Sequence, residues 1–409
     1  MRETDPFPIP HQGLTATHQL DWAAMARKLV GDVLRLERHE RVLISADPYC
    51  GGAMLEAVRA EIQRAGAIEL ATILHWTPAL TALRKPDGTK PDPADARAED
   101  EAMGRVFANA DVFLWLQNDW RSPRSTMTIG QSELILETWP GRSIHFHWFH
   151  DPGNPDPDHP SNKALDLVYQ DAVLNLDYGQ LRRRMQGLVS RMAERELRIT
   201  TPAGTDLRLR MGARFHVNDG DASKSKAAAA RTARDREEEI PCGALRSIPL
   251  LDSVEGIITL RGGFGFPTMG YGFDIDRWLD QGLRFHFEGG KIRRVETDGD
   301  QAALDRAWQT ESGDKDRLGE MVLGCNPLLR RVDGLTFPPY HGFGDAILRL
   351  TIGENTESGG QNRSSLHRWL MFFDADIRAG TDLLVSKGRL TEPANGGAGH
   401  YPPGGKKGN

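Results

Sequence analysis

Two short apolar runs flanking a helical pattern constrain the fold of this chain more than any other feature. Residues 41–46 are rich in β-branched side chains, and residues 54–65 carry apolar side chains at helical spacing before Gly66, a typical helix-ending glycine. Residues 68–75 and 110–116 have the composition of further strands. A strand, a helix and a strand within roughly 35 residues define a parallel βαβ unit. The first half therefore predicts an α/β domain with a parallel sheet.

The rest of the chain predicts a second, different domain. With 409 residues the chain exceeds the size at which one hydrophobic core stops growing. After residue 197 the pattern changes to short strands with glycine-rich turns, which indicates a strand-rich α+β domain. Charge and alanine dominate residues 219–239, for which we expect a mobile insertion. The predicted division is an N-terminal extension (1–40), an α/β domain (41–163), a connecting helix (164–197), the α+β domain (198–391) and a disordered tail (392–409).

Composition narrows the class of protein. The net charge is −6, from 51 basic and 57 acidic residues, which argues against general nucleic-acid binding. Three widely spaced cysteines fit a reducing compartment rather than a disulfide framework. No run approaches the roughly 18 apolar residues of a membrane span, and the start lacks a signal-peptide pattern. We expect a cytoplasmic protein that binds neither nucleic acid nor membrane.

Two segments carry candidate chemistry. The polar, glycine-rich loop 353–366 delivers His367 onto an apolar strand, a setting typical of metal ligands and catalytic bases. Glu320 stands among apolar neighbours, where an unpaired charge would be costly. A cation is therefore expected to face Glu320.

These segments resemble a known family. The loop before His367, the Leu-Gly-Glu segment 318–320, and residues 199–207 followed by 212–214 are similar to the M29 family of metalloaminopeptidases. The same fold houses the iron-dependent 2,5-dihydroxypyridine dioxygenases, whose loop resembles residues 355–360. The similarity runs from about residue 41 to residue 390 and implies an M29-like fold, with the metal site in the α+β domain, a small-molecule substrate and a homodimer.

The resemblance also implies a changed metal site. The aminopeptidases hold two metals, but their first glutamate falls on Ala244, a histidine falls near Arg349, and an aspartate falls on Trp369. Too few ligands remain for two metals. Glu320 and His367 are retained as candidate ligands.

The dioxygenase branch uses one iron under two histidines and one carboxylate. A metal bound by Glu320 and His367 would therefore need a third ligand from this chain. His341 is the leading candidate, since the glycines after it allow close backbone approach. Asp374 and Asp376 are the other options.

Three functions remain open at this point. The first is a mononuclear Fe(II)-dependent, extradiol-type dioxygenase that cleaves a small hydroxylated aromatic or N-heterocyclic ring, with Arg349 gripping an anionic group of the substrate. The second is an aminopeptidase-like hydrolase with a rearranged Zn, Mn or Co site. The third is a metal-free scaffold that binds a small molecule, in which Glu320 forms a salt bridge with Arg349.

A histidine group in the first domain is a further candidate. His145 and His147 alternate with aromatic residues, which favours an edge strand. His147 and His150 are expected to contact substrate, because the N-terminal domain of the resembled fold covers the site. Zinc binding by this group is a weaker alternative, since carboxylate and cysteine partners at the usual spacing are missing.

Overall fold

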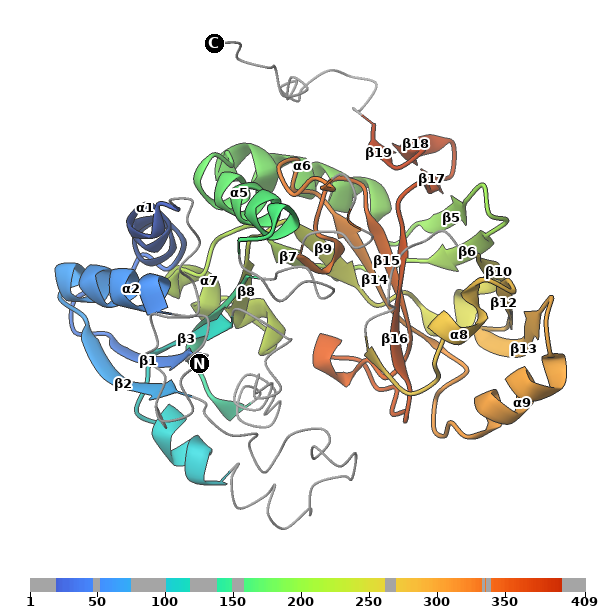
Figure 1. The fold of residues 1–409 in the computed structure, drawn as a ribbon, viewed down its shortest axis with the longest axis horizontal. Coiled ribbons are helices and arrows are strands. Elements are labelled where there is room, and N and C mark those ends of the chain that lie inside the picture. The colour runs from blue at the N-terminus through green and yellow to red at the C-terminus, as the bar shows by residue number, and fades with distance from the viewer. Residues whose placement is uncertain are drawn as a thin grey trace. The chain divides into compact units, whose positions relative to one another are not determined.

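The computed structural model describes residues 20–46, 52–74, 101–117, 138–148, 158–261, 270–332, 335 and 340–391. These residues form two compact units (Figure 1). The first contains the described residues up to Leu176, the segment Gly220–Cys242, and residues 332 and 335. The second contains Asp177–Asp219, Gly243–Arg331 and residues 340–391. Within the described ranges no helix is long and apolar enough to span a membrane.

The first unit is built on a five-stranded parallel sheet with the strand order β2-β1-β3-β4-β8. Its strands are β1 (Arg41–Ala46), β2 (Ile68–Leu74), β3 (Val112–Gln117), β4 (Arg142–His147) and β8 (Glu237–Ile240). The helix α2 (Gly52–Ala65) connects β1 to β2, so the predicted βαβ unit is confirmed. The middle strands are buried along nearly their whole length, as expected for a parallel sheet.

The other named helical segments of this unit are α1 (Trp22–Arg27), a π-helical turn η2 (Lys28–Val33), α5 (Pro160–Leu174), α7 (Lys224–Ala228) and a 3-10 turn η3 (Arg234–Arg236). Of these, α1, α5 and α7 begin at residues whose side chains cap the helix. Asp21 caps α1 by accepting from the Ala24 N–H, and Trp22 packs 4.9 Å from Trp148, measured between ring centroids. Residues 20–33 thus pack within the first unit.

Two sequence predictions about this sheet are wrong. The strand β4 is not an edge strand, because β8 pairs with it in parallel. The strand β8 comes from the segment predicted to be a mobile insertion, and its three glutamates are all buried. Glu238 accepts from the Gly220 N–H at 2.8 Å and lies 3.5 Å from Lys226 Nζ, while Arg234 pairs with Glu237. Pairing with β4, together with these ion pairs, therefore orders a stretch that looks solvent-exposed in sequence.

The predicted connecting helix is two helices. The first, α5, ends at Leu174, and α6 (Tyr178–Met192) begins after Asp177, whose side chain accepts from the Gln180 N–H. Two arginines of α6 form salt bridges within the second unit, Arg182 to Asp219 and Arg184 to Asp345, both at 2.8 Å. Arg182 and Arg184 therefore hold this helix to the rest of the second unit.

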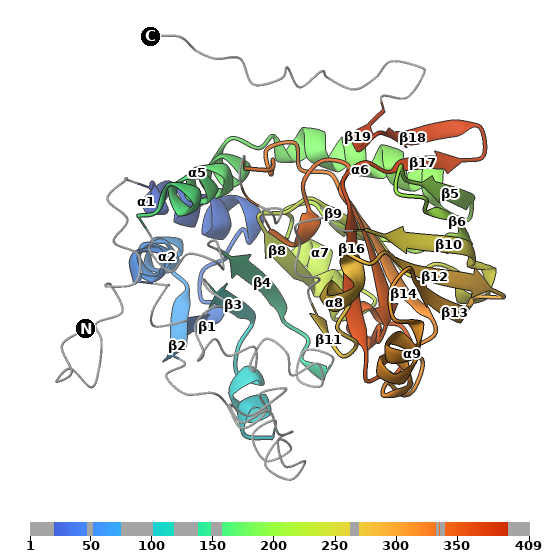
Figure 2. The ribbon, with the colours of Figure 1, turned by 45° about the vertical axis from the view of Figure 1, so that its right-hand side comes forward.

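The second unit contains two antiparallel sheets (Figure 2). The larger has the order β13-β12-β10-β6-β5-β17-β18-β19, and the smaller has the order β11-β16-β15-β14-β9-β7. The strands of the larger sheet are β5 (Glu196–Thr200), β6 (Asp206–Arg210), β10 (Glu255–Leu260), β12 (Leu283–Glu288), β13 (Lys291–Thr297), β17 (Asp376–Ala379), β18 (Asp382–Ser386) and β19 (Arg389–Leu390). The strands of the smaller sheet are β7 (His216–Asn218), β9 (Ala244–Ser247), β11 (Gly270–Tyr271), β14 (Leu318–Gly324), β15 (Leu348–Gly353) and β16 (His367–Phe372).

Short helices and turns complete this unit. They are α8 (Asp276–Leu279), α9 (Gln301–Gln309) and the 3-10 turns η4 (Leu251–Ser253), η5 (Tyr340–Gly342) and η6 (Thr356–Ser358). A parallel sheet in one unit and strand-rich antiparallel sheets in the other agree with the predicted fold class.

Candidate functional site

One face of the six-stranded sheet gathers the polar candidates. In the register of β15 and β16, Thr351 lies opposite Trp369, and Gly353 lies opposite His367. Alternate residues of a strand share a face, so Arg349 and Thr351 project on the same side as His367 and Trp369. The guanidinium carbon of Arg349 lies 4.0 Å from the centroid of the Trp369 ring, which establishes the shared side directly.

Glu320 on β14 is only 3% exposed, and both of its carboxylate oxygens are engaged. Oε1 accepts from an Arg349 N–H at 2.8 Å, and Oε2 accepts from the Ser358 hydroxyl at 2.5 Å. Burial raises the pKa of Glu320, but Arg349, Arg246 and the Ser358 hydroxyl outweigh it, so that the pKa lies below its usual range. The cation predicted to face Glu320 is thus a guanidinium of the same chain, itself completely buried.

His367 begins β16 and uses both ring nitrogens. Nε2 accepts from the Trp369 indole N–H at 2.7 Å, and Nδ1 lies 2.9 Å from the Glu354 carbonyl oxygen. An indole N–H only donates and a carbonyl only accepts, so the proton is on Nδ1 and the ring is neutral. The Tyr271 ring stacks on His367 with centroids 5.6 Å apart. We call the connected set Tyr271, His367, Trp369, Arg349, Glu320 and Ser358 the Glu320–His367 network.

The other predicted ligands do not join this network among the described residues. Asp374 follows the far end of β16, about 20 Å along the strand from His367 at the usual rise per residue. Asp376 opens β17 in the other sheet and accepts from the Lys387 N–H at 2.5 Å. His341 lies in the turn η5, and its side chain is outside the described part.

A metal does not fit the network as it stands. A metal at Glu320 would have to displace the Arg349 and Ser358 contacts, and a metal at His367 would need the Nε2 lone pair that Trp369 occupies. Within the described ranges, no group of three or more histidine, cysteine, aspartate or glutamate side chains could hold a metal ion. The Glu320 carboxylate and the His367 ring nitrogens are engaged within the chain, and a guanidinium faces Glu320 where a metal cation would otherwise lie.

The histidines of the first unit lie in a different setting. His145 and His147 project from β4 beside Trp115, and both are buried. His145 Nε2 lies 3.5 Å from Glu237 Oε2. His150 is outside the described residues. The substrate contacts expected for His147 and His150 stay predictions.

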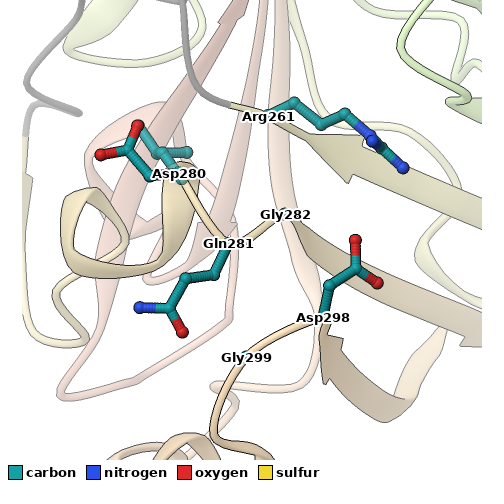
Figure 3. Close-up of a pocket in the computed structure, with 7 residues that line it drawn as sticks. Arg261, Asp280, Gln281, Gly282, Asp298 and Gly299 are labelled. Atoms are coloured by element: carbon teal, nitrogen blue, oxygen red, sulfur yellow. The ribbon is translucent and has the colours of Figure 1, made fainter.

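The second unit also contains an open cavity of about 470 Å³. Its lining includes Arg261, Gln281 and Asp298, at the ends of β10, β12 and β13 (Figure 3). Asp298 is paired with Arg284. None of the residues selected from sequence lines this cavity, so it carries no part of the candidate site.

Three residues of the site, Tyr271, Trp369 and Ser358, were not predicted from sequence as contributors. Trp369 was noted only as a lost ligand, yet it links His367 to Arg349. Ser358 lies in the glycine-rich loop before His367, and its hydroxyl donates a hydrogen bond to Glu320. The pairing of neighbouring strands brings these side chains together, and a local sequence pattern does not predict that pairing.

The described residues form a two-unit fold, with the Glu320–His367 network on the smaller antiparallel sheet of the second unit. No protein-family model matches the chain, and no curated protein matches it in sequence. Two solved structures share its fold. The 2,5-dihydroxypyridine dioxygenase of Pseudomonas putida KT2440 is 17% identical, with a TM-score of 0.63 over 91% of this chain and 97% of its own. AmpT of Thermus thermophilus, an M29 aminopeptidase, is 16% identical, with a TM-score of 0.59 over 90% of this chain and 98% of its own. The resemblance inferred from sequence is confirmed at the level of the fold.

Glu320 makes the stability of the protein depend on pH. Because its pKa is lower in the folded than in the unfolded protein, its contribution is present above the usual glutamate value of 4.5 and is lost as the pH falls through the lower folded value. The free energy of unfolding should therefore fall more steeply below pH 4.5 in the wild type than in the Glu320→Gln, Arg349→Met double variant. Urea unfolding at a series of pH values measures both slopes. Equal slopes would show that Glu320 is not held ionised.

Proposed function

We propose that this protein binds a small planar hydroxylated aromatic or N-heterocyclic compound at the Glu320–His367 network, without a resident metal. One observation carries the proposal. Arg349 donates a hydrogen bond to Glu320 and stacks on the Trp369 ring, and the Trp369 indole N–H donates to His367. Tyr271, His367 and Trp369 are only half buried, so they offer an aromatic surface beside the buried ion pair. The two enzymes that share the fold support an enzymatic role.

The residues suggest how such a compound would be held. The Tyr271 and Trp369 rings would contact its faces and edges, and the neutral His367 stays oriented by Glu354. Arg349 would stay bound to Glu320 and keep the Trp369 ring in place by stacking on it. The chain's own groups would thus provide the aromatic contacts and the orientation of the bound compound.

Calorimetric titration with 2,5-dihydroxypyridine, without oxygen and with a chelator present, tests this proposal. We expect saturable binding to the wild type. Tyr271→Leu should weaken it by about three- to tenfold, the usual worth of an aromatic contact. Tyr178→Leu is the matched control, since Tyr178 lies at the start of α6 in the same unit. Absence of binding to the wild type, or equal weakening by both substitutions, would overturn the proposal.

An iron-dependent dioxygenase is the second candidate, favoured by the fold shared with such an enzyme over 91% of the chain. It would require Glu320 and His367 to leave Arg349 and Trp369 and to bind iron with a third ligand such as His341. Oxygen uptake with 2,5-dihydroxypyridine, dependent on added Fe(II) and abolished by His367→Ala, would establish it. The hydrolase alternative predicts instead the oxygen-independent release of amino acids from peptides.

A further inference from the structure

Thr351 lies beside the Glu320–His367 network, on the same face of the sheet. It is in the middle of β15, directly opposite Trp369, and it is fully buried. Because it follows Arg349 by two residues, its side chain projects from the same face. Its methyl carbon is close to the neighbouring strand, since a Cβ built on Gly319 would lie 3.2 Å from it. The side chain therefore lies between β14 and β16, beside the ion pair.

The Thr351 hydroxyl has no hydrogen-bond partner among the described residues. A buried hydroxyl without a partner destabilises the folded protein, and such groups are rare in native structures. Valine has nearly the same shape and suits a strand equally well. The neighbouring polar groups of Glu320 and His367, by contrast, are satisfied within the chain.

We propose that Thr351 is a specificity-determining residue whose hydroxyl binds a polar substituent of the ligand. This inference rests on the proposed function and adds the group that the ligand must carry. A threonine hydroxyl both donates and accepts, so its partner is a neutral hydroxyl or a ring nitrogen. Arg349 already has an anionic partner in Glu320, so the position beside Thr351 calls for no further anion. A water molecule is the other source of the same hydrogen bond, and the experiment separates the two.

Thr351→Val and Thr351→Ser test the assignment, with 2,5-dihydroxypyridine as the probe. We expect Thr351→Val to bind the probe about tenfold more weakly, as the loss of one hydrogen bond implies, and Thr351→Ser to stay within about threefold of the wild type. Without probe, Thr351→Val should melt no lower than the wild type, because it removes an unsatisfied group. Thr205→Val is the matched control and should melt lower, because the Thr205 hydroxyl accepts from the Thr259 N–H at 3.0 Å.

The outcomes distinguish the two proposals. If the wild type binds the probe and Thr351→Val binds it equally well, the role of Thr351 is overturned while the proposed function stands. A lower melting temperature for Thr351→Val with unchanged probe affinity would assign the hydroxyl to a structural water. If the wild type does not bind the probe, the proposed function fails, and this inference fails with it.

Discussion

Replacing Arg349 with methionine should destabilise the protein by about 3–5 kcal/mol, because it leaves the buried Glu320 carboxylate without its cation. Glu320→Gln should cost a similar amount, because it removes the carboxylate that faces the buried guanidinium. The double variant should cost less than either single change, since a buried ion pair replaced by uncharged side chains of similar volume is often close to neutral. Urea unfolding of the four proteins gives the coupling energy.

A control pair in the same unit shows whether burial is the cause. Arg198 and Asp206 join β5 to β6 at 2.7 Å, but both side chains are nearly half exposed. The corresponding changes, Arg198→Met and Asp206→Asn, should each cost about 1 kcal/mol or less. Equal costs at the two pairs would contradict the view that Arg349 takes the place of a metal cation.

The second large effect is a gain of metal binding. Replacing Arg349 with histidine and Trp369 with aspartate should create a site for one divalent metal. Both changes restore residue types that the resemblance assigns to those positions. Both also remove the hydrogen bonds that Arg349 now donates to Glu320 and Trp369 now donates to His367. Two histidines and two carboxylates would then face one another from β14, β15 and β16, a donor set suited to Zn²⁺ or Co²⁺.

Metal content after dialysis and the visible spectrum of added Co²⁺ measure this gain. An Arg349→Ala, Trp369→Ala variant is the control, because it opens the same space without supplying ligands. We expect stoichiometric metal in the first variant and none in the second. If neither variant binds metal, the Glu320–His367 network does not correspond to a metal site whose ligands have been replaced.

Local patterns in the sequence were sufficient to predict the first three strands of the parallel sheet and the helix α2. The strand β8 was missed, because three consecutive glutamates have no alternating pattern, and their burial depends on Arg234 and Lys226. The break between α5 and α6 was not predicted; it lies at Asp177, whose side chain caps the start of α6.

The site was predicted only in part. Burial of Glu320 requires a cation, and Arg349 is one of the partners that the sequence offers. The hydrogen bond from Trp369 to His367 could not be foreseen, because it depends on the orientation of two side chains on one strand. That bond distinguishes a histidine free to bind metal from one already satisfied.

An anaerobic Fe²⁺ titration of the wild-type protein, followed by bound metal and melting temperature, tests the central claim most directly. A metal that binds only the folded protein raises the melting temperature as its concentration exceeds the dissociation constant. We predict no stoichiometric iron and no change in melting temperature. One iron per chain, with a rise in melting temperature that Glu320→Gln and His367→Ala each abolish, would contradict the claim that Arg349 and Trp369 occupy the metal-binding groups.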